Sequence, residues 1–134
     1  MDSGAIHAVA LWVGLNLLLI LILSMLVVRQ RQKHKVDLGD GGIAELAQAI
    51  RALGNATEYI PAGLIGLLVL AMTGTAASAV LVHVAGFLLF AGRVVHAIGL
   101  SNSGGASFAR TIGMLATWVA YIFMIAATLF NAIG

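Results

Sequence analysis

Four long apolar stretches dominate this sequence of 134 residues and restrict what it can fold into. An α-helix needs about 20 mostly apolar residues to cross the roughly 30 Å of hydrocarbon in a bilayer. The expected spans that meet this length are residues 6–28, 43–72, 76–100 and 108–132. Only 9% of the residues are charged, against roughly 25% in an average soluble domain. The sequence therefore predicts an all-α membrane protein, a four-transmembrane-helix bundle that forms one domain over residues 1–134.

Basic residues indicate how this bundle is oriented. Arg29, Arg31, Lys33 and Lys35 follow the first span, whereas the N-terminal segment carries Asp2 and no lysine or arginine. Because cytoplasmic loops carry an excess of Lys and Arg, we expect residues 29–42 in the cytoplasm and both termini outside. We interpret this charge as a topology signal and expect no nucleic-acid partner. The end of the loop, residues 37–42, is predicted to be a flexible connector.

A polar face occupies the first half of the second span. Gln48, Arg51, Asn55 and Glu58 follow i, i+3, i+4 spacing, which places them within roughly 80° of arc on one side of a helix. Ionisable groups at membrane depth cost roughly 2.5–3.5 kcal/mol each, so this face must meet protein or a wet cavity. Pro61 follows in the same span, and proline tends to kink a helix. A kink there would open a cavity mouth at the level of Glu58.

Three more polar residues lie where the third span ends and the fourth begins. Arg93 and His96 are three residues apart, and Arg110 opens the fourth span. In the predicted topology they share the cytoplasmic side with the polar face of the second span. Gly92 and Gly99 lie on nearly the same side as His96, so another helix is expected to approach closely there.

Each polar residue alone also has a purely structural explanation. Arg51 with Glu58 would serve as an ion pair that fixes helix register, and Arg93 and Arg110 would snorkel to the headgroups. Taken together, however, three arginines, a glutamate, two amides and a histidine at one membrane level favour a binding site.

The chemistry of these side chains indicates the class of ligand. Three guanidiniums with one carboxylate suit an anion that also carries an amide or ammonium group, since arginine binds carboxylates through paired hydrogen bonds. A small acidic peptide fits this profile better than an inorganic ion. The histidines lack the spacing of metal ligands, so no metal is expected. The chain has no cysteine, so any sulfur chemistry must come from a ligand.

Residues 48–61, Gln-Ala-Ile-Arg-Ala-Leu-Gly-Asn-Ala-Thr-Glu-Tyr-Ile-Pro, closely resemble the second-helix signature of a known family. This family comprises the membrane-associated proteins in eicosanoid and glutathione metabolism, which include the microsomal glutathione transferases. Residues 92–99 resemble the end of the family's third helix, and the four-span layout agrees over nearly the whole chain. The chain is rich in Ala and Gly and has short loops, and in this it resembles the bacterial branch of the family. This resemblance implies a location in the bacterial inner membrane.

The resemblance implies a homotrimer that binds glutathione between subunits at the cytoplasmic side and transfers it to hydrophobic electrophiles, with peroxidase activity as a second reaction. It implies that Arg51, Asn55, Glu58 and Tyr59 hold the tripeptide and that Gln48 and Arg93 support them. Arg29 or Arg31 would reach in from an adjacent subunit. Arg110 matches the arginine credited with stabilising the glutathione thiolate. The resemblance thus implies Arg110 as the catalytic residue. The glutathione-binding residues that it implies are Gln48, Arg51, Asn55, Glu58, Tyr59, Arg93, His96, Arg29 and Arg31.

Two positions depart from the family pattern. His96 and Leu100 stand where the leukotriene-producing synthases carry tyrosines, so leukotriene formation is not implied. Two other functions stay open. One is a non-catalytic membrane protein that binds a lipid or a partner in the same cleft, because the family contains such a member. The other is a small proton-linked carrier that uses Glu58 and His96.

Overall fold

Four helices account for nearly all of the chain in the computed structural model, which describes residues 3–73, 78–102 and 105–133. The helices are α1 (Ser3–His34), α2 (Ala44–Thr73), α3 (Ser78–Asn102) and α4 (Phe108–Ile133). Each is long and apolar enough to cross a membrane. The prediction of an all-α bundle with four membrane spans is therefore confirmed.

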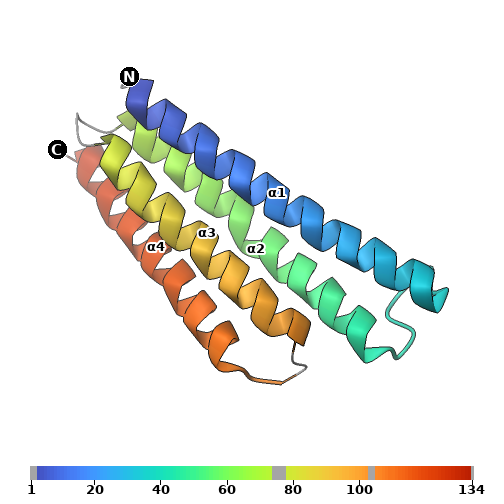
Figure 1. Cartoon of the computed structure of the whole chain (residues 1–134). Helices are drawn as coiled ribbons and strands as arrows, with labels where there is room; N and C mark the ends of the chain where they lie inside the picture. Colours follow the sequence, from blue (N-terminus) through green and yellow to red (C-terminus); the bar gives the residue numbers. More distant parts are fainter. Residues whose placement is uncertain (1–2, 74–77, 103–104, 134) are drawn as a thin grey trace.

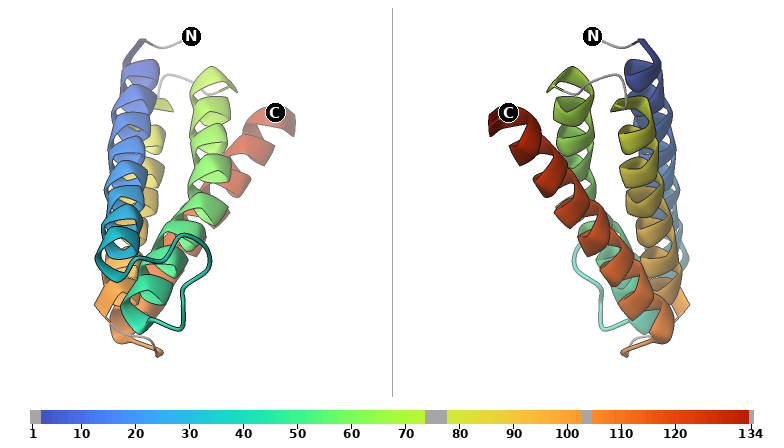
Figure 2. Two further views of the ribbon diagram at one scale, coloured as in Figure 1. Left: turned by 90° about the vertical axis from the view of Figure 1, so that its right-hand side faces the viewer. Right: turned by 90° about the vertical axis from the view of Figure 1, so that its left-hand side faces the viewer.

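Each helix runs antiparallel to the next one along the chain. The beginning of α1 and the end of α4 therefore lie at the same end of the bundle (Figure 1). α1 packs against α2 and α3, whereas α4 packs against α3 and α2. Towards the end at which the chain begins, α2 and α4 spread away from α1 and α3 (Figure 2). The opposite end holds the end of α1, the beginning of α2, the end of α3 and the beginning of α4. The predicted polar residues of these segments are thus brought to one end of the bundle.

Apolar side chains both fill the bundle and cover its outside. One core cluster includes Trp12, Leu67 and Leu89, and a second, nearer the polar end, includes Leu23 and Ile60. Large apolar side chains such as those of Leu17, Phe87 and Ile122 are exposed on the outer surface. A soluble protein rarely exposes so much apolar area, but lipid tails solvate such a surface.

Glycines bring α3 and α4 into direct backbone contact. A Cβ atom added to Gly92 would lie 2.8 Å from the carbonyl oxygen of Gly113, and one added to Gly113 would lie 2.5 Å from the backbone nitrogen of His96. A Cβ on Gly99 would lie 2.8 Å from the Cγ of Arg110. Small residues permit this approach in membrane bundles, where close packing replaces the hydrophobic driving force. The predicted close contact at Gly92 and Gly99 is made by α4.

The segment between α1 and α2 differs from the prediction. α1 continues to His34, and the connecting segment is wrapped around Arg31, whose Nη1 donates to the carbonyls of Val36 (3.3 Å), Asp37 (3.1 Å) and Gly39 (3.0 Å). Gly39, Gly41 and Gly42 have φ values of 66°, 59° and 73°, which suit glycine far better than other residues. The segment is therefore held by specific hydrogen bonds, not a free connector as the sequence suggested.

Other helix ends shift by a few residues. Thr73, Ser101 and Asn102 are helical, although the sequence placed them in turns. The remainder of the predicted turn at 74–75, the predicted start of the third span at 76, and residues 103–104 lie outside the described residues. α2 remains helical through Pro61.

Candidate functional site

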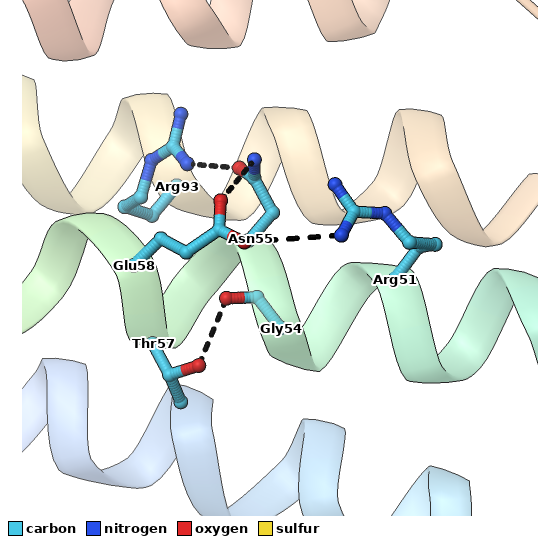
Figure 3. Close-up of polar contacts among 6 residues, drawn as sticks. All are labelled: Arg51, Gly54, Asn55, Thr57, Glu58 and Arg93. Carbon is cyan, nitrogen blue, oxygen red and sulfur yellow. Dashed lines mark hydrogen bonds and ion pairs between the residues drawn. The ribbon is translucent and has the colours of Figure 1, made fainter. Parts of the chain in front are cut away.

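A buried arginine lies at the centre of the polar residues. Arg93 of α3 is only 1% exposed, and its Nη1 donates to Oδ1 of Asn55 on α2 at 2.6 Å (Figure 3). Its guanidinium carbon lies 4.8 Å from the centre of the Tyr59 ring, within the range of a cation–π contact. We call Arg51, Asn55, Glu58, Tyr59 and Arg93 the polar cluster.

Arg93 also reaches α4. Its Nε donates to Oγ1 of Thr117 at 2.9 Å, and its Nη2 points at the sulfur of Met114 at 3.8 Å. In the described part of the chain, the ion pair found joins Arg51 and Glu58 and does not involve Arg93. The buried guanidinium is thus solvated by neutral acceptors and an aromatic face.

The Asn55 side chain already makes two hydrogen bonds within the polar cluster. Its oxygen accepts from Arg93, and its Nδ2 faces Oε2 of Glu58 at 3.5 Å (Figure 3). An amide oxygen has two lone pairs and an NH₂ group has two hydrogens, so after these contacts Asn55 keeps one acceptor position and one donor position.

Arg51 and Glu58 form the outer part of the polar cluster. Arg51 Nη1 lies 3.8 Å from Oε1 of Glu58, and their side chains are 63% and 54% exposed. Such charges cannot face lipid without a cost of roughly 2.5–3.5 kcal/mol each. In this chain taken alone, this part of the polar cluster is therefore not covered by protein. Gln48 is half-buried one turn before Arg51 on the same helix.

A pocket of about 290 Å³ lies between α3 and α4, next to the polar cluster. It is polar near the start of α4 and apolar beyond. We call it the α4 pocket. Its lining residues are His96, Ala106, Ser107, Arg110, Thr111, Met114, Leu115 and Trp118.

The first turn of α4 places Arg110 in this pocket. Ser107 caps the helix, because its Oγ accepts from the backbone N–H of Arg110 at 3.3 Å and its carbonyl accepts from that of Thr111 at 3.1 Å. Such serine caps satisfy N–H groups that the first turn leaves without partners. The Arg110 Nη1 donates to the carbonyl of Gly105, so this guanidinium is anchored on one side and lines the α4 pocket with the other.

His96 connects the polar cluster with the α4 pocket. It is buried, lines the α4 pocket and lies within electrostatic range of Arg51, Arg93 and Arg110. The three arginines that the sequence assigned to one membrane level are thus all at the same end of the bundle, near enough to His96 to interact with it electrostatically. Leu100 is also buried, in the core cluster with Leu23 and Ile60.

The two basic residues at the end of α1 have different surroundings. The Nη1 of Arg31 donates to three carbonyls of the segment that connects α1 to α2. Arg29 is exposed and lines a groove of about 490 Å³ on α1 together with Met25 and Gln32. Within the subunit neither arginine is part of the polar cluster.

Sequence reasoning missed three residues of α4. Thr117 is fully buried and contacts Arg93, Trp118 lines the α4 pocket, and the Tyr121 hydroxyl donates to the carbonyl of Tyr59. None of the three was among the site residues predicted from the sequence. The one available signal for Thr117 was a hydroxyl in an apolar span, one turn after Gly113.

These features define a small integral membrane protein of four helices that keeps a charged, partly buried site at one end of the bundle. The sequence matches the MAPEG family over residues 9–130. The chain therefore belongs to this family, which includes glutathione transferases.

Relatives in two strains of Escherichia coli are similar over most of the chain. Both are called inner membrane protein YecN and are 42% identical over 120 residues, which cover 90% of this chain and 88% of theirs. The name of these relatives gives a location and no reaction.

Proposed function

We propose that this protein is a glutathione-dependent transferase of the inner membrane, which joins the glutathione thiolate to hydrophobic electrophiles. The observation that carries the proposal is the polar cluster around buried Arg93, next to a pocket that is lined by His96 and Arg110 and has apolar walls beyond them. Family membership and the location of the relatives support it.

Glutathione suits the polar cluster chemically. It carries two carboxylates, one ammonium group and two peptide bonds. Arg51 would bind a carboxylate through paired hydrogen bonds, and Glu58 would accept from the ammonium group. Asn55 already bonds Arg93 and Glu58, and its remaining N–H would donate to a carbonyl or carboxylate oxygen of the ligand.

Arg110 would supply the activation step. A neighbouring cation lowers the pKa of a thiol from its usual value of about 8.5, so the Arg110 guanidinium favours loss of the thiol proton to water. The thiolate sulfur then attacks an electrophilic carbon held between Met114, Leu115 and Trp118. A carbon–sulfur bond forms, and in an aromatic substitution chloride leaves with the electrons of the broken bond.

A homotrimer would complete the site. Arg51 and Glu58 are more than half exposed in one subunit and need a polar cover within the membrane. A neighbouring copy would supply that cover, and Arg29, with its exposed side chain, is better placed than Arg31 to reach across. In this arrangement the end of the bundle that carries the site faces the cytoplasm with its basic residues.

Thiolate formation tests this function directly. Purified protein in detergent is titrated with glutathione near neutral pH while thiolate absorbance and conjugation of chlorodinitrobenzene are recorded. We expect a thiolate signal in the wild type, its loss in Arg110→Ala, and partial retention in Arg110→Lys. Lys33→Ala, which removes an exposed cation at the end of α1, is the matched control and should behave as wild type.

Other results would favour the remaining functions. A wild type with neither a thiolate signal nor conjugation would refute the transferase proposal. Copurified lipid that glutathione does not displace would then indicate a lipid-binding protein. Proton-coupled uptake into liposomes, lost in Glu58→Gln, would indicate a carrier.

A further inference from the structure

We infer that Thr117 is a positioning residue for the glutathione site: it does not touch the ligand, but it fixes Arg93 and, through Arg93, the amide of Asn55. This inference rests on the proposed function. It concerns a residue of α4 that neither the signature in α2 nor the thiolate-binding arginine includes.

The Thr117 hydroxyl already donates its hydrogen within its own helix. Thr117 is completely buried, and its hydroxyl donates to the carbonyl of Gly113 on its own helix at 2.9 Å. A hydroxyl has one hydrogen to donate and two lone pairs. Thr117 can therefore act towards α3 only as an acceptor, which is what the Nε of Arg93 requires at 2.9 Å.

Arg93 is a buried cation and needs hydrogen-bond acceptors. A guanidinium that is 1% exposed has given up its water, and an ionised group buried without partners is costly. In the described residues its nitrogens find Thr117, Asn55 and the Met114 sulfur. The sulfur is a weak acceptor. Thr117 and Asn55 consequently hold the two ends of the guanidinium plane, and the loss of one releases the other.

The third step is the effect on the ligand. The Arg93 Nη1 holds the Asn55 oxygen at 2.6 Å, and this decides that the Asn55 NH₂ group points towards Glu58. If Arg93 rotates, the amide is free to turn and to present its oxygen to a carboxylate of the ligand, which repels it. Thr117 on α4 thereby determines whether Asn55 on α2 presents a hydrogen-bond donor or an acceptor to the ligand.

The close approach of α3 and α4 at Gly92 leaves room for the Thr117 hydroxyl: a Cβ on Gly92 would lie 2.8 Å from the Thr117 Oγ1. Any larger residue at position 92 would displace the hydroxyl that Arg93 uses. Gly92 therefore serves the same contact from the side of α3.

The experiment compares Thr117→Val, which keeps the shape and deletes the hydroxyl, with Thr117→Ser, which keeps the hydroxyl. Glutathione affinity is measured by calorimetry, and KM values are measured for glutathione and for chlorodinitrobenzene. Because a hydrogen bond to a charged group is lost, we expect Thr117→Val to weaken glutathione binding about tenfold or more, with the KM for the electrophile unchanged. Thr117→Ser should remain within about threefold of the wild type. Thr117→Ala removes the same acceptor and replaces the valine variant if that protein does not purify in a folded state.

A double-mutant cycle separates positioning from general destabilisation. In an Asn55→Ala background the valine substitution should have no further effect on glutathione affinity, because the amide it orients is gone. If both effects add in full, or if Thr117→Val binds glutathione as the wild type does, the inference is wrong while the transferase proposal stands. A wild type that does not bind glutathione would overturn both, and it is recognised by its failure before any variant is made.

Discussion

The contact between α3 and α4 at Gly113 offers the sharpest test of the structure, through the substitution Gly113→Ala. The added Cβ would lie 2.5 Å from the backbone nitrogen of His96 and 2.6 Å from the carbonyl oxygen of Gly92. Both neighbours are backbone atoms and cannot rotate away. To reach an ordinary contact of 3.4 Å, α3 and α4 must separate by about 0.9 Å at this level.

Two effects of this substitution oppose each other. Overpacking costs about 1–3 kcal/mol, whereas replacing glycine by alanine within a helix contributes about 0.5–1 kcal/mol of stability. The net expectation is a loss of about 1–2 kcal/mol in the free energy of unfolding. A separation of this size would also stretch the bond between Arg93 and Thr117 from 2.9 Å beyond the range of a hydrogen bond. We therefore expect weaker glutathione binding as well as a lower melting temperature.

The assay uses the fluorescence of Trp12 and Trp118 to follow thermal unfolding in detergent, together with calorimetric titration of glutathione. Gly14→Ala is the matched control, because a Cβ at Gly14 meets nothing within 4 Å in the subunit. This control should be as stable as the wild type or slightly more stable. A Gly113→Ala protein that melts and binds glutathione like the wild type would show that α3 and α4 do not meet as described.

Further predictions concern other residues at the polar end of the bundle. Replacing the buried Arg93 by methionine removes a desolvated charge together with its hydrogen bonds. The melting temperature should therefore change little, while the affinity for glutathione falls at least tenfold. A protein that unfolds instead would show that the fold itself requires Arg93. Trp118→Ala should lower kcat/KM for chlorodinitrobenzene several-fold through loss of apolar contact in the α4 pocket and leave the thiolate absorbance intact; an equal loss of both signals would contradict this division of roles. Arg31→Ala should increase proteolysis of residues 35–43, because three carbonyls lose their donor, whereas Arg29→Ala should leave this segment resistant but weaken glutathione binding. Coexpression of Arg29→Ala and Arg51→Ala subunits should restore part of the activity, and complete inactivity of the mixture would argue against a site shared between subunits.

The sequence was sufficient for the four spans because membrane helices are specified by length and apolar composition. It erred where that rule stops applying. α1 runs on to His34, since Arg, Gln and Lys are good helix formers and need not lie in the hydrocarbon. The connecting segment was misjudged because the partner that holds it, Arg31, lies several residues earlier in the chain.

The site shows the same division between local and tertiary information. Helical spacing alone placed Arg51, Asn55 and Glu58 on one face of a helix, and glycine spacing predicted a close neighbour beside His96. Nothing in the spacing could reveal that Arg93 occupies the oxygen of Asn55, because that bond joins residues on two helices. Thr117 escaped notice for a related reason. A threonine whose hydroxyl donates to its own helix looks satisfied in sequence, and only the packing of α3 against α4 exposes its second role.

The balance of charge ties the polar cluster to the α4 pocket. Within one chain, Arg51, Arg93 and Arg110 contribute three cations and Glu58 one anion, so two positive charges remain among these four side chains. Glutathione with an intact thiol brings one net negative charge, from two carboxylates and one ammonium group, and would leave one positive charge uncompensated. Loss of the thiol proton supplies the missing negative charge. In surroundings of low dielectric constant this compensation is worth far more than in water, so on the proposed function the whole site, and not Arg110 alone, favours the thiolate. Removal of any one of the three arginines should then raise the pKa of the bound thiol, and the effect should be largest for Arg110, which lines the pocket where the sulfur would lie.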